Sequence, residues 1–244
     1  MGRASGLSVM AAGVLLACGS ALAGGGTNSY VSFSEGNEGW VLNGWDVPSP
    51  TGGNPGAHLH WDNFVDTFGM EARTDSNSAF IGDYTQKGEV TISLDYKVNF
   101  ISFFGTPVPR DLVLILRDYD TFNGFDPASV WIHLGTLDGN GMDWTHFSAD
   151  VTDVFSETLP GAWRGAGAED PNTFEPILPV GRTWTNVLQG VDEIAFTTFV
   201  PGFFYGFTNF NVSIDNVNIA PVPSPAGISA IGLMGAVTVI RRRR

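Results

Sequence analysis

The sequence contains one cysteine and few basic residues. Cys18 is the single thiol of a 244-residue chain, and 12 lysines and arginines stand against 25 acidic residues, a net charge of −13. One cysteine cannot form a disulfide within the chain, so stability has to come from a packed core or from bound ions. The acidic surplus repels phosphate backbones, which excludes nucleic acid as a partner.

Motifs that identify common enzyme classes are also missing. The sequence has no Gly-x-Ser-x-Gly nucleophile elbow and no phosphate-binding glycine loop. Asp118 and Asp120 would share a strand face, as a glycosidase pair can, but acids are so frequent that one pair carries little information. His58 and His60 would also share a strand face and could chelate a transition metal, without a third ligand close in sequence. We therefore predict a protein that is not an enzyme.

The first 23 residues have the pattern of a signal peptide. Arg3 precedes an apolar stretch from Leu7 to Cys18, which is too short to cross a hydrocarbon core of about 30 Å. The small residues of Ala21-Leu22-Ala23 follow it, so we predict cleavage before Gly24 by signal peptidase. As an alternative, the segment from Leu15 to Cys18 loosely resembles a lipobox, in which Cys18 would be lipidated.

Residues 221–244 form a tail in three parts. The short motif Val222-Pro223-Ser224-Pro225 is followed by an uncharged segment from Ala226 to Ile240 and by the cluster Arg241, Arg242, Arg243 and Arg244. Fifteen helical residues would reach about 22 Å, a marginal membrane span. The arginines would hold this end on the cytoplasmic side, with the preceding domain outside.

This tail resembles the PEP-CTERM sorting signal of exopolysaccharide-producing bacteria, with Ser224 where that family usually has Glu. The resemblance implies transient insertion into the inner membrane, recognition by an exosortase-type processing enzyme and cleavage near the motif. It implies delivery to the cell surface or the extracellular matrix, or secretion. An ordinary tail anchor is the alternative.

Between these ends, residues 24–220 are predicted to form one acidic domain. This segment holds seven basic and 25 acidic residues, a net charge of −18 with histidines neutral. Such a charge favours cations and keeps an extracellular surface soluble.

The pattern of apolar residues predicts an all-β domain. Val90 to Val98 alternates strictly between apolar and polar side chains, as in a half-buried strand. Other strand-like runs are 30–33, 40–42, 57–61, 112–116, 130–134, 194–199 and 212–219. The expected helical turns, near 150–156 and 185–190, are too short to cover a sheet, so sheet must pack on sheet. We predict a jelly-roll β-sandwich of about nine antiparallel strands, with one long loop over 158–183.

Several short blocks resemble laminin B (laminin IV type A) domains. They are Phe33 to Trp40, Gly52 to Gly56, Met142 to Phe147, Asn186 to Asp192 and Ile214 to Val217. The last block also closes many galactose-binding-like jelly rolls, including carbohydrate-binding modules. The resemblance implies a non-catalytic extracellular module.

Related jelly rolls often hold a structural calcium between the first loop and the last strand. Glu35 and Asp215 occupy the matching positions here, and Ca²⁺ takes oxygen ligands from several segments. The alternative is that both are ordinary turn residues. The segment from Asp138 to Asp143 also begins like a calcium loop but lacks the distal Glu, so we predict a hairpin turn there.

Aromatic residues are candidates for stacking against sugar rings. Trp45, Trp61 and Trp163 are the predicted surface platforms, whereas Trp40, Trp131 and Trp144 lie in strand patterns and are predicted to be core. The phenylalanines around Pro201-Gly202 are expected to form either a hydrophobic plug or an exposed adhesive loop.

The sequence therefore predicts an exported, non-enzymatic surface or matrix protein that binds exopolysaccharide or another glycan. The alternatives are a structural matrix protein without a specific ligand and a secreted glycoside hydrolase.

Overall fold

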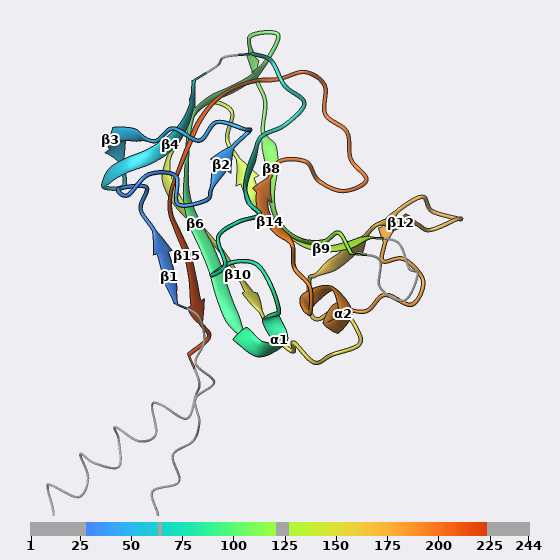
Figure 1. The fold of residues 1–244 in the computed structure, drawn as a ribbon. Coiled ribbons are helices and arrows are strands. Elements are labelled where there is room, and N and C mark those ends of the chain that lie inside the picture. The colour runs from blue at the N-terminus through green and yellow to red at the C-terminus, as the bar shows by residue number, and fades with distance from the viewer. Residues whose placement is uncertain (1–27, 63–64, 121–126, 224–244) are drawn as a thin grey trace, which may run out of the picture.

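The computed structural model describes residues 28–62, 65–120 and 127–223. Two antiparallel sheets pack face to face as a sandwich (Figure 1). No helix in these three ranges has the length and apolar composition needed to cross a membrane. The predicted signal peptide, and the sorting tail from Ser224 to Arg244, lie outside the described residues.

The first sheet is built around β6 and is called the β6 sheet. Its order is β10-β6-β15-β4-β3, with β1 beside β15 and β7 beside β6. The strands are β1 (Ser29–Val31), β3 (Ser49–Gly53), β4 (Gly56–Asp62), β6 (Val90–Phe103), β7 (Thr106–Pro107), β10 (Met142–Val151) and β15 (Asn209–Pro221). Because β1 pairs with the end of β15, both described termini lie at the same end of the sandwich (Figure 1).

The second sheet, called the β8 sheet, has the order β11-β9-β8-β14-β5-β2. Its strands are β2 (Val41–Leu42), β5 (Glu71–Thr74), β8 (Arg110–Asp118), β9 (Ala128–Leu137), β11 (Arg164–Ala166) and β14 (Glu193–Thr197). A separate pair, β12 (Ala168–Glu169) and β13 (Pro176–Ile177), projects beside it. The described helices, α1 (Tyr84–Lys87) and α2 (Trp184–Leu188), are one turn long.

The core lies between the two sheets. Alternate residues of β6, including Ile92 and Leu94, point inward and are fully buried, as are Leu114 and Leu116 of β8. Trp40 packs edge-on against Phe80 at 5.1 Å, which confirms its predicted core position. Burial of this apolar surface is the main source of stability for a domain without a disulfide.

The predicted sandwich of antiparallel strands is confirmed, and each predicted strand run overlaps an observed strand. The short elements β3, β5, β7, β11, β12 and β13 were not predicted. The long β10 was predicted only at Trp144, which was placed in a strand pattern, and a bulge between Met142 and Thr145 interrupts its alternation. The helical turn predicted near 150–156 is wrong, since β10 continues to Val151 and no helix follows there. The turn predicted near 185–190 is confirmed by α2, whose amide of Asn186 donates to the capping hydroxyl of Thr183.

The carboxylates of Asp95 and Asp215, on the outer face of the β6 sheet, bind the turn of the β3–β4 hairpin. Asp215 accepts hydrogen bonds from the backbone amides of Asn54 (2.6 Å) and Asn216 (2.7 Å). Its cross-strand neighbour Asp95 accepts from the Asn54 side chain (2.9 Å) and pairs with His146 (2.8 Å). Burial raises the pKa of Asp215 even though the two amides act against it. These contacts satisfy buried carboxylates that would otherwise be costly to desolvate.

His58 lies on the same outer face, beside His60 at 5.7 Å between ring centroids. Its ring meets Trp144 edge-on at 5.9 Å, and its buried Nδ1 has no hydrogen-bond partner among the described residues. Burial, with the charges of His60 and Lys97, lowers the pKa of His58 from its ordinary 6.5 to about 4. His58 is therefore neutral in the folded protein at neutral pH.

His58 should make stability depend on pH between its two pKa values. Because the pKa in the folded state lies below 6.5, unfolded chains bind a proton that folded chains exclude. Stability present above pH 6.5 is then lost as pH falls towards 4, by roughly 1 to 3 kcal/mol. Urea unfolding at pH 7.5 and 4.5 should show this dependence shrinking in His58→Phe. The control His133→Gln, which removes an exposed histidine, should retain this dependence. If the unfolding free energy changes equally between the two pH values in all three proteins, His58 is not its source.

Candidate functional site

The β8 sheet is apolar on its outer face as well as on its inner one. Val113 and Ile115 of β8, Ala195 of β14 and Trp131 of β9 form a second buried cluster there, joined by Ala166 of β11. Strand alternation places them opposite the core residues of the same strands. This outer face needs a cover of its own, because exposed apolar surface of this extent is unfavourable.

The long segment after β10 supplies part of that cover. Its strand β11 pairs with β9. The indole of Trp163 donates to the carbonyl of Asp150 at 3.1 Å, and its ring lies 4.9 Å from that of Trp184. Farther along, Arg182 forms a buried ion pair with Asp118 at the end of β8. The predicted long loop is therefore ordered and tied to the sandwich at both ends.

A charge network around the buried carboxylate of Glu193 continues this face towards β5. The carboxylate of Glu193 pairs with Arg73 and Arg117 and accepts from the Tyr119 hydroxyl at 2.9 Å. Arg117 also pairs with Glu71 at 2.6 Å. Burial alone would raise the pKa of Glu193, but these hydrogen bonds and charges outweigh it and hold that pKa below its usual value. Glu193 therefore stays ionised, and the guanidinium groups of Arg73 and Arg117 are used in ion pairs with it.

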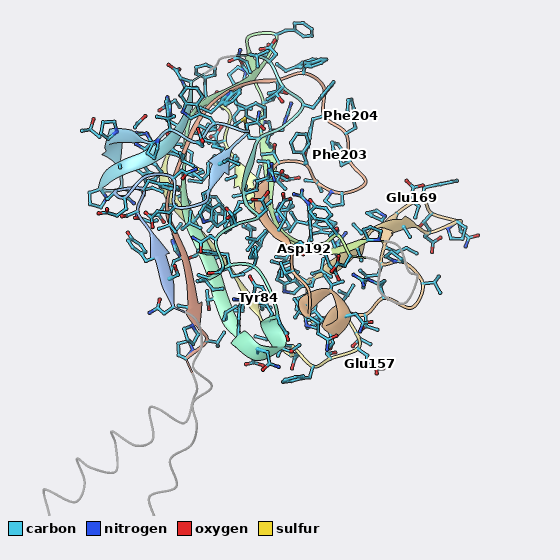
Figure 2. All side chains as sticks on the ribbon, in the orientation of Figure 1. Tyr84, Glu157, Glu169, Asp192, Phe203 and Phe204 are labelled. Atoms are coloured by element: carbon cyan, nitrogen blue, oxygen red, sulfur yellow. The ribbon has the colours of Figure 1, made fainter. Side chains whose placement is uncertain are left out.

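An open groove of about 990 Å³ lies over the other end of the face. Its lining comes from Trp131, from Leu159, from residues 163–165, from residues 173–178 and from residues 200–203. Figure 1 shows that the arm formed by β12 and β13, called the β12 arm, and the loop before β15 project from the same side of the sandwich. Figure 2 labels Glu169 on that arm and Phe203 on that loop.

The groove combines an apolar floor with polar groups. Trp131 is 6% exposed, and its indole Nε1 has no hydrogen-bond partner among the described residues. Its cross-strand neighbour Arg164 holds its guanidinium 5.5 Å from the ring centroid of Trp131. Phe174 and Phe203 on the rims are 73% and 60% exposed. A concave site that sets polar groups beside aromatic side chains can bind a ligand that is itself partly polar.

The predicted stacking residues have three different positions. Trp61 is 7% exposed and belongs to the main core, so its predicted surface position is wrong. Trp45 is 40% exposed, as predicted, but its indole donates to the carbonyl of Val47 at 3.0 Å and it does not line the groove. Trp163 lines the groove, but it is 6% exposed, belongs to the main core and uses its N–H, so its predicted surface position is wrong as well. Whether any of them binds a ligand stays a prediction.

Two tryptophans predicted as core lie instead on outer faces. Trp144 is half-buried beside His58 on the β6 sheet, so its predicted core position is wrong. Trp131 is buried, as predicted, but in the outer cluster of the β8 sheet. The signal was present in the sequence, since Val130 to Leu134 carries apolar residues at adjacent positions, as strands buried on both faces do.

The loop around Pro201-Gly202 is exposed rather than a plug. Phe199, Phe203, Phe204 and Phe207 are all exposed, and the rings of Phe204 and Phe207 pack beside Phe68. Of the two expectations, an exposed loop is therefore the one that matches the structure, and its adhesive role stays a prediction. The hairpin predicted near Asp138 is wrong in part: a tight turn forms, because the amide of Gly141 donates to the Asp138 carbonyl at 3.2 Å, but β9 and β10 on either side of it belong to different sheets.

The predicted calcium ligands have different surroundings. Glu35 is exposed, whereas Asp215 is buried and both of its oxygens accept backbone N–H groups. A calcium ion would have to share those oxygens, and the calcium site stays a prediction. Elsewhere, carboxylate oxygens of Asp118, Asp120 and Asp192 lie within 4.8 Å of one another, although Asp118 is already paired with Arg182.

No family model matches the sequence, and no curated protein matches it. The fold is similar to the N-terminal CBM22-1 and GH10 modules of endo-1,4-β-D-xylanase 10B from Clostridium thermocellum, complexed with xylohexaose. That match has 13% identity and a TM-score of 0.43, covering 80% of this chain and 28% of that chain. It is also similar to the CBM22-2 xylan-binding domain of a Paenibacillus barcinonensis protein, with 13% identity and a TM-score of 0.41, covering 80% and 99% of the two chains. Similarity at this level does not identify a ligand.

Residues 173–178 and 200–203 form the two rims of the groove, and they meet where Gly202 contacts Pro176. This glycine has φ +77°, and a Cβ added to it would lie 2.7 Å from Cδ of Pro176. The backbone conformation and the close approach both favour glycine here. The contact therefore sets how the loop before β15 sits against β13.

Gly202→Ala should destabilise the protein through this contact. We expect a loss of about 2 to 3 kcal/mol of unfolding free energy in urea, from backbone strain of about 1 to 2 kcal/mol and displacement of Pro176. Gly44→Ala is the matched control, because Gly44 has φ +85° and nothing within 4 Å of an added Cβ. It should show the strain alone. Equal losses in both variants would mean that the rims do not depend on each other.

Proposed function

We propose that the protein is an exported, non-enzymatic jelly-roll module that binds exopolysaccharide or another glycan in the groove beside Trp131. The predicted signal peptide and sorting tail support export through the inner membrane and processing by signal peptidase and an exosortase-type enzyme. The acidic composition suits a soluble surface or matrix protein.

The observation that carries this proposal is the floor of the groove. A pyranose ring has an apolar face of C–H groups and a rim of hydroxyls, so a site for it needs a flat apolar surface next to donors and acceptors. Trp131 forms a buried apolar floor, and the exposed guanidinium of Arg164 beside its ring supplies N–H donors. Exposed Phe174 and Phe203 add aromatic surface on the two rims. The combination suits a sugar better than a wholly apolar ligand.

The acids around the groove favour binding over cleavage. Among the described lining residues, Glu175 is the one carboxylic acid. Glycoside hydrolysis in most families uses two carboxyl groups on either side of the scissile bond. The clustered acids Asp118, Asp120 and Asp192 do not line this groove. A binding module is therefore the better account than a secreted hydrolase.

Removing a rim aromatic should weaken glycan binding without unfolding the protein. Calorimetry against a panel of soluble bacterial and plant polysaccharides, xylan included, should identify a ligand of the unmodified protein. Phe174→Ala and Phe203→Ala should then weaken binding about fivefold, which corresponds to the loss of about 1 kcal/mol of aromatic contact with the sugar. Unfolding free energies should change by less than about 0.5 kcal/mol, because both side chains are exposed.

Phe104→Ala is the matched control. Phe104 is 91% exposed and has positive φ, as Phe174 does, but it lies outside the groove. Its affinity should match that of the unmodified protein. Binding to no glycan of the panel would favour a structural matrix protein without a ligand, and turnover of a polysaccharide would favour the hydrolase.

A further inference from the structure

Arg164 differs from the other arginines of the described domain. Arg73, Arg117 and Arg182 form ion pairs with carboxylates, and Arg110 is buried against Thr208. Arg164 is exposed and, within the described ranges, has no ion pair with a carboxylate. This is notable in a segment with 25 acidic residues, where most arginines find a partner.

The strand pairing holds Arg164 in a defined place. It lies directly across from Trp131 in the β11–β9 ladder, with its guanidinium 5.5 Å from the ring centroid. A cation–π contact positions the guanidinium and uses none of its five N–H donors. Those donors form a planar fork that matches the two oxygens of a carboxylate. The groove therefore presents an oriented carboxylate receptor next to an apolar ring.

The negative charge of the domain does not prevent this. Repulsion between distant charges is screened over about 8 Å at physiological ionic strength, whereas a direct bidentate contact is screened much less. The acid that lines the groove is Glu175, so one local negative charge opposes one local positive charge. The balance at the floor is set by Arg164, which lies against Trp131.

We infer that the groove selects acidic glycans, with Arg164 binding the carboxylate of a uronic acid residue beside Trp131. This inference rests on the proposed function and names the ligand class of that same site. Arg164 is then the specificity-determining residue. A neutral sugar would leave its fork without a charged partner, which lowers affinity relative to the acidic counterpart.

The test compares one polymer with and without its carboxylates. Polygalacturonate and alginate are each measured against their carboxyl-reduced forms by calorimetry with the whole protein. We expect the acidic form to bind at least tenfold more tightly. Arg164→Gln should weaken binding of the acidic form about tenfold and should weaken binding of the reduced form much less, so that most of the preference is lost. Arg164→Lys should retain part of the preference, and Glu175→Gln should strengthen binding of the acidic form.

Lys97→Gln is the matched control for charge. It removes the same single positive charge, from a side chain 6.0 Å from the ring centroid of Trp144 on the outer face of the β6 sheet. Its affinities should stay within twofold of the unmodified protein. An equal effect of Lys97→Gln and Arg164→Gln would mean that only net charge matters and would overturn the assignment.

Different results would refute the role of Arg164 and the proposed binding of glycans. Equal binding of acidic and reduced polymers, both weakened by Phe174→Ala, would overturn the role of Arg164 and leave glycan binding in place. Binding to none of these polymers, nor to the neutral panel, would overturn the proposed function itself. Thermal unfolding of each variant confirms that the comparison is between folded proteins.

Discussion

The two-sided burial of the β8 sheet is the constraint on which the site depends. Leu114 and Leu116 of β8 fill the core between the sheets, while Val113 and Ile115 of the same strand are buried on the outer face. No described helix is long enough to cover that face, so irregular segments cover it. These segments leave more space over the sheet than a packed helix would. The groove lies between the segment after β10 and the loop before β15. The need to bury an outer face therefore produces a binding-type cavity.

The two outer faces of the sandwich use different chemistry. On the β6 sheet the buried groups include the carboxylates of Asp95 and Asp215, which accept hydrogen bonds from Asn54, Asn216 and His146, and the ring of His58, whose Nδ1 has no described partner. On the β8 sheet the buried groups are apolar side chains next to the Glu193 ion-pair network. Buried charge needs hydrogen bonds or an opposite charge, and on the β8 sheet the partners of the buried carboxylates of Glu193 and Asp118 are arginines. The few cations of this acidic chain are thus largely committed to structure, and Arg164 is a marked departure from that pattern.

The geometry of the groove follows from strand register. Trp131 and Arg164 are 33 positions apart in the chain, and the antiparallel pairing of β9 with β11 makes them neighbours on one face. The rim on the other side depends on Gly202, whose lack of a side chain lets Pro176 approach. Backbone geometry therefore sets the floor and the rims, and side chains supply the surface chemistry.

Local patterns in the sequence determined the all-β architecture and much of its strand content. The alternation from Val90 to Val98 specifies one buried face, because successive side chains of a strand point to opposite sides. The same rule places Leu59 and Trp61 inward and His58 and His60 outward, so the error at Trp61 came from not applying the alternation. Only the tertiary structure decided that Trp131 faces away from the core, that Arg164 lies against it and that Asp215 is buried under Asn54. These relations depend on pairing between distant segments, which a single sequence leaves open because many registers satisfy the same local pattern.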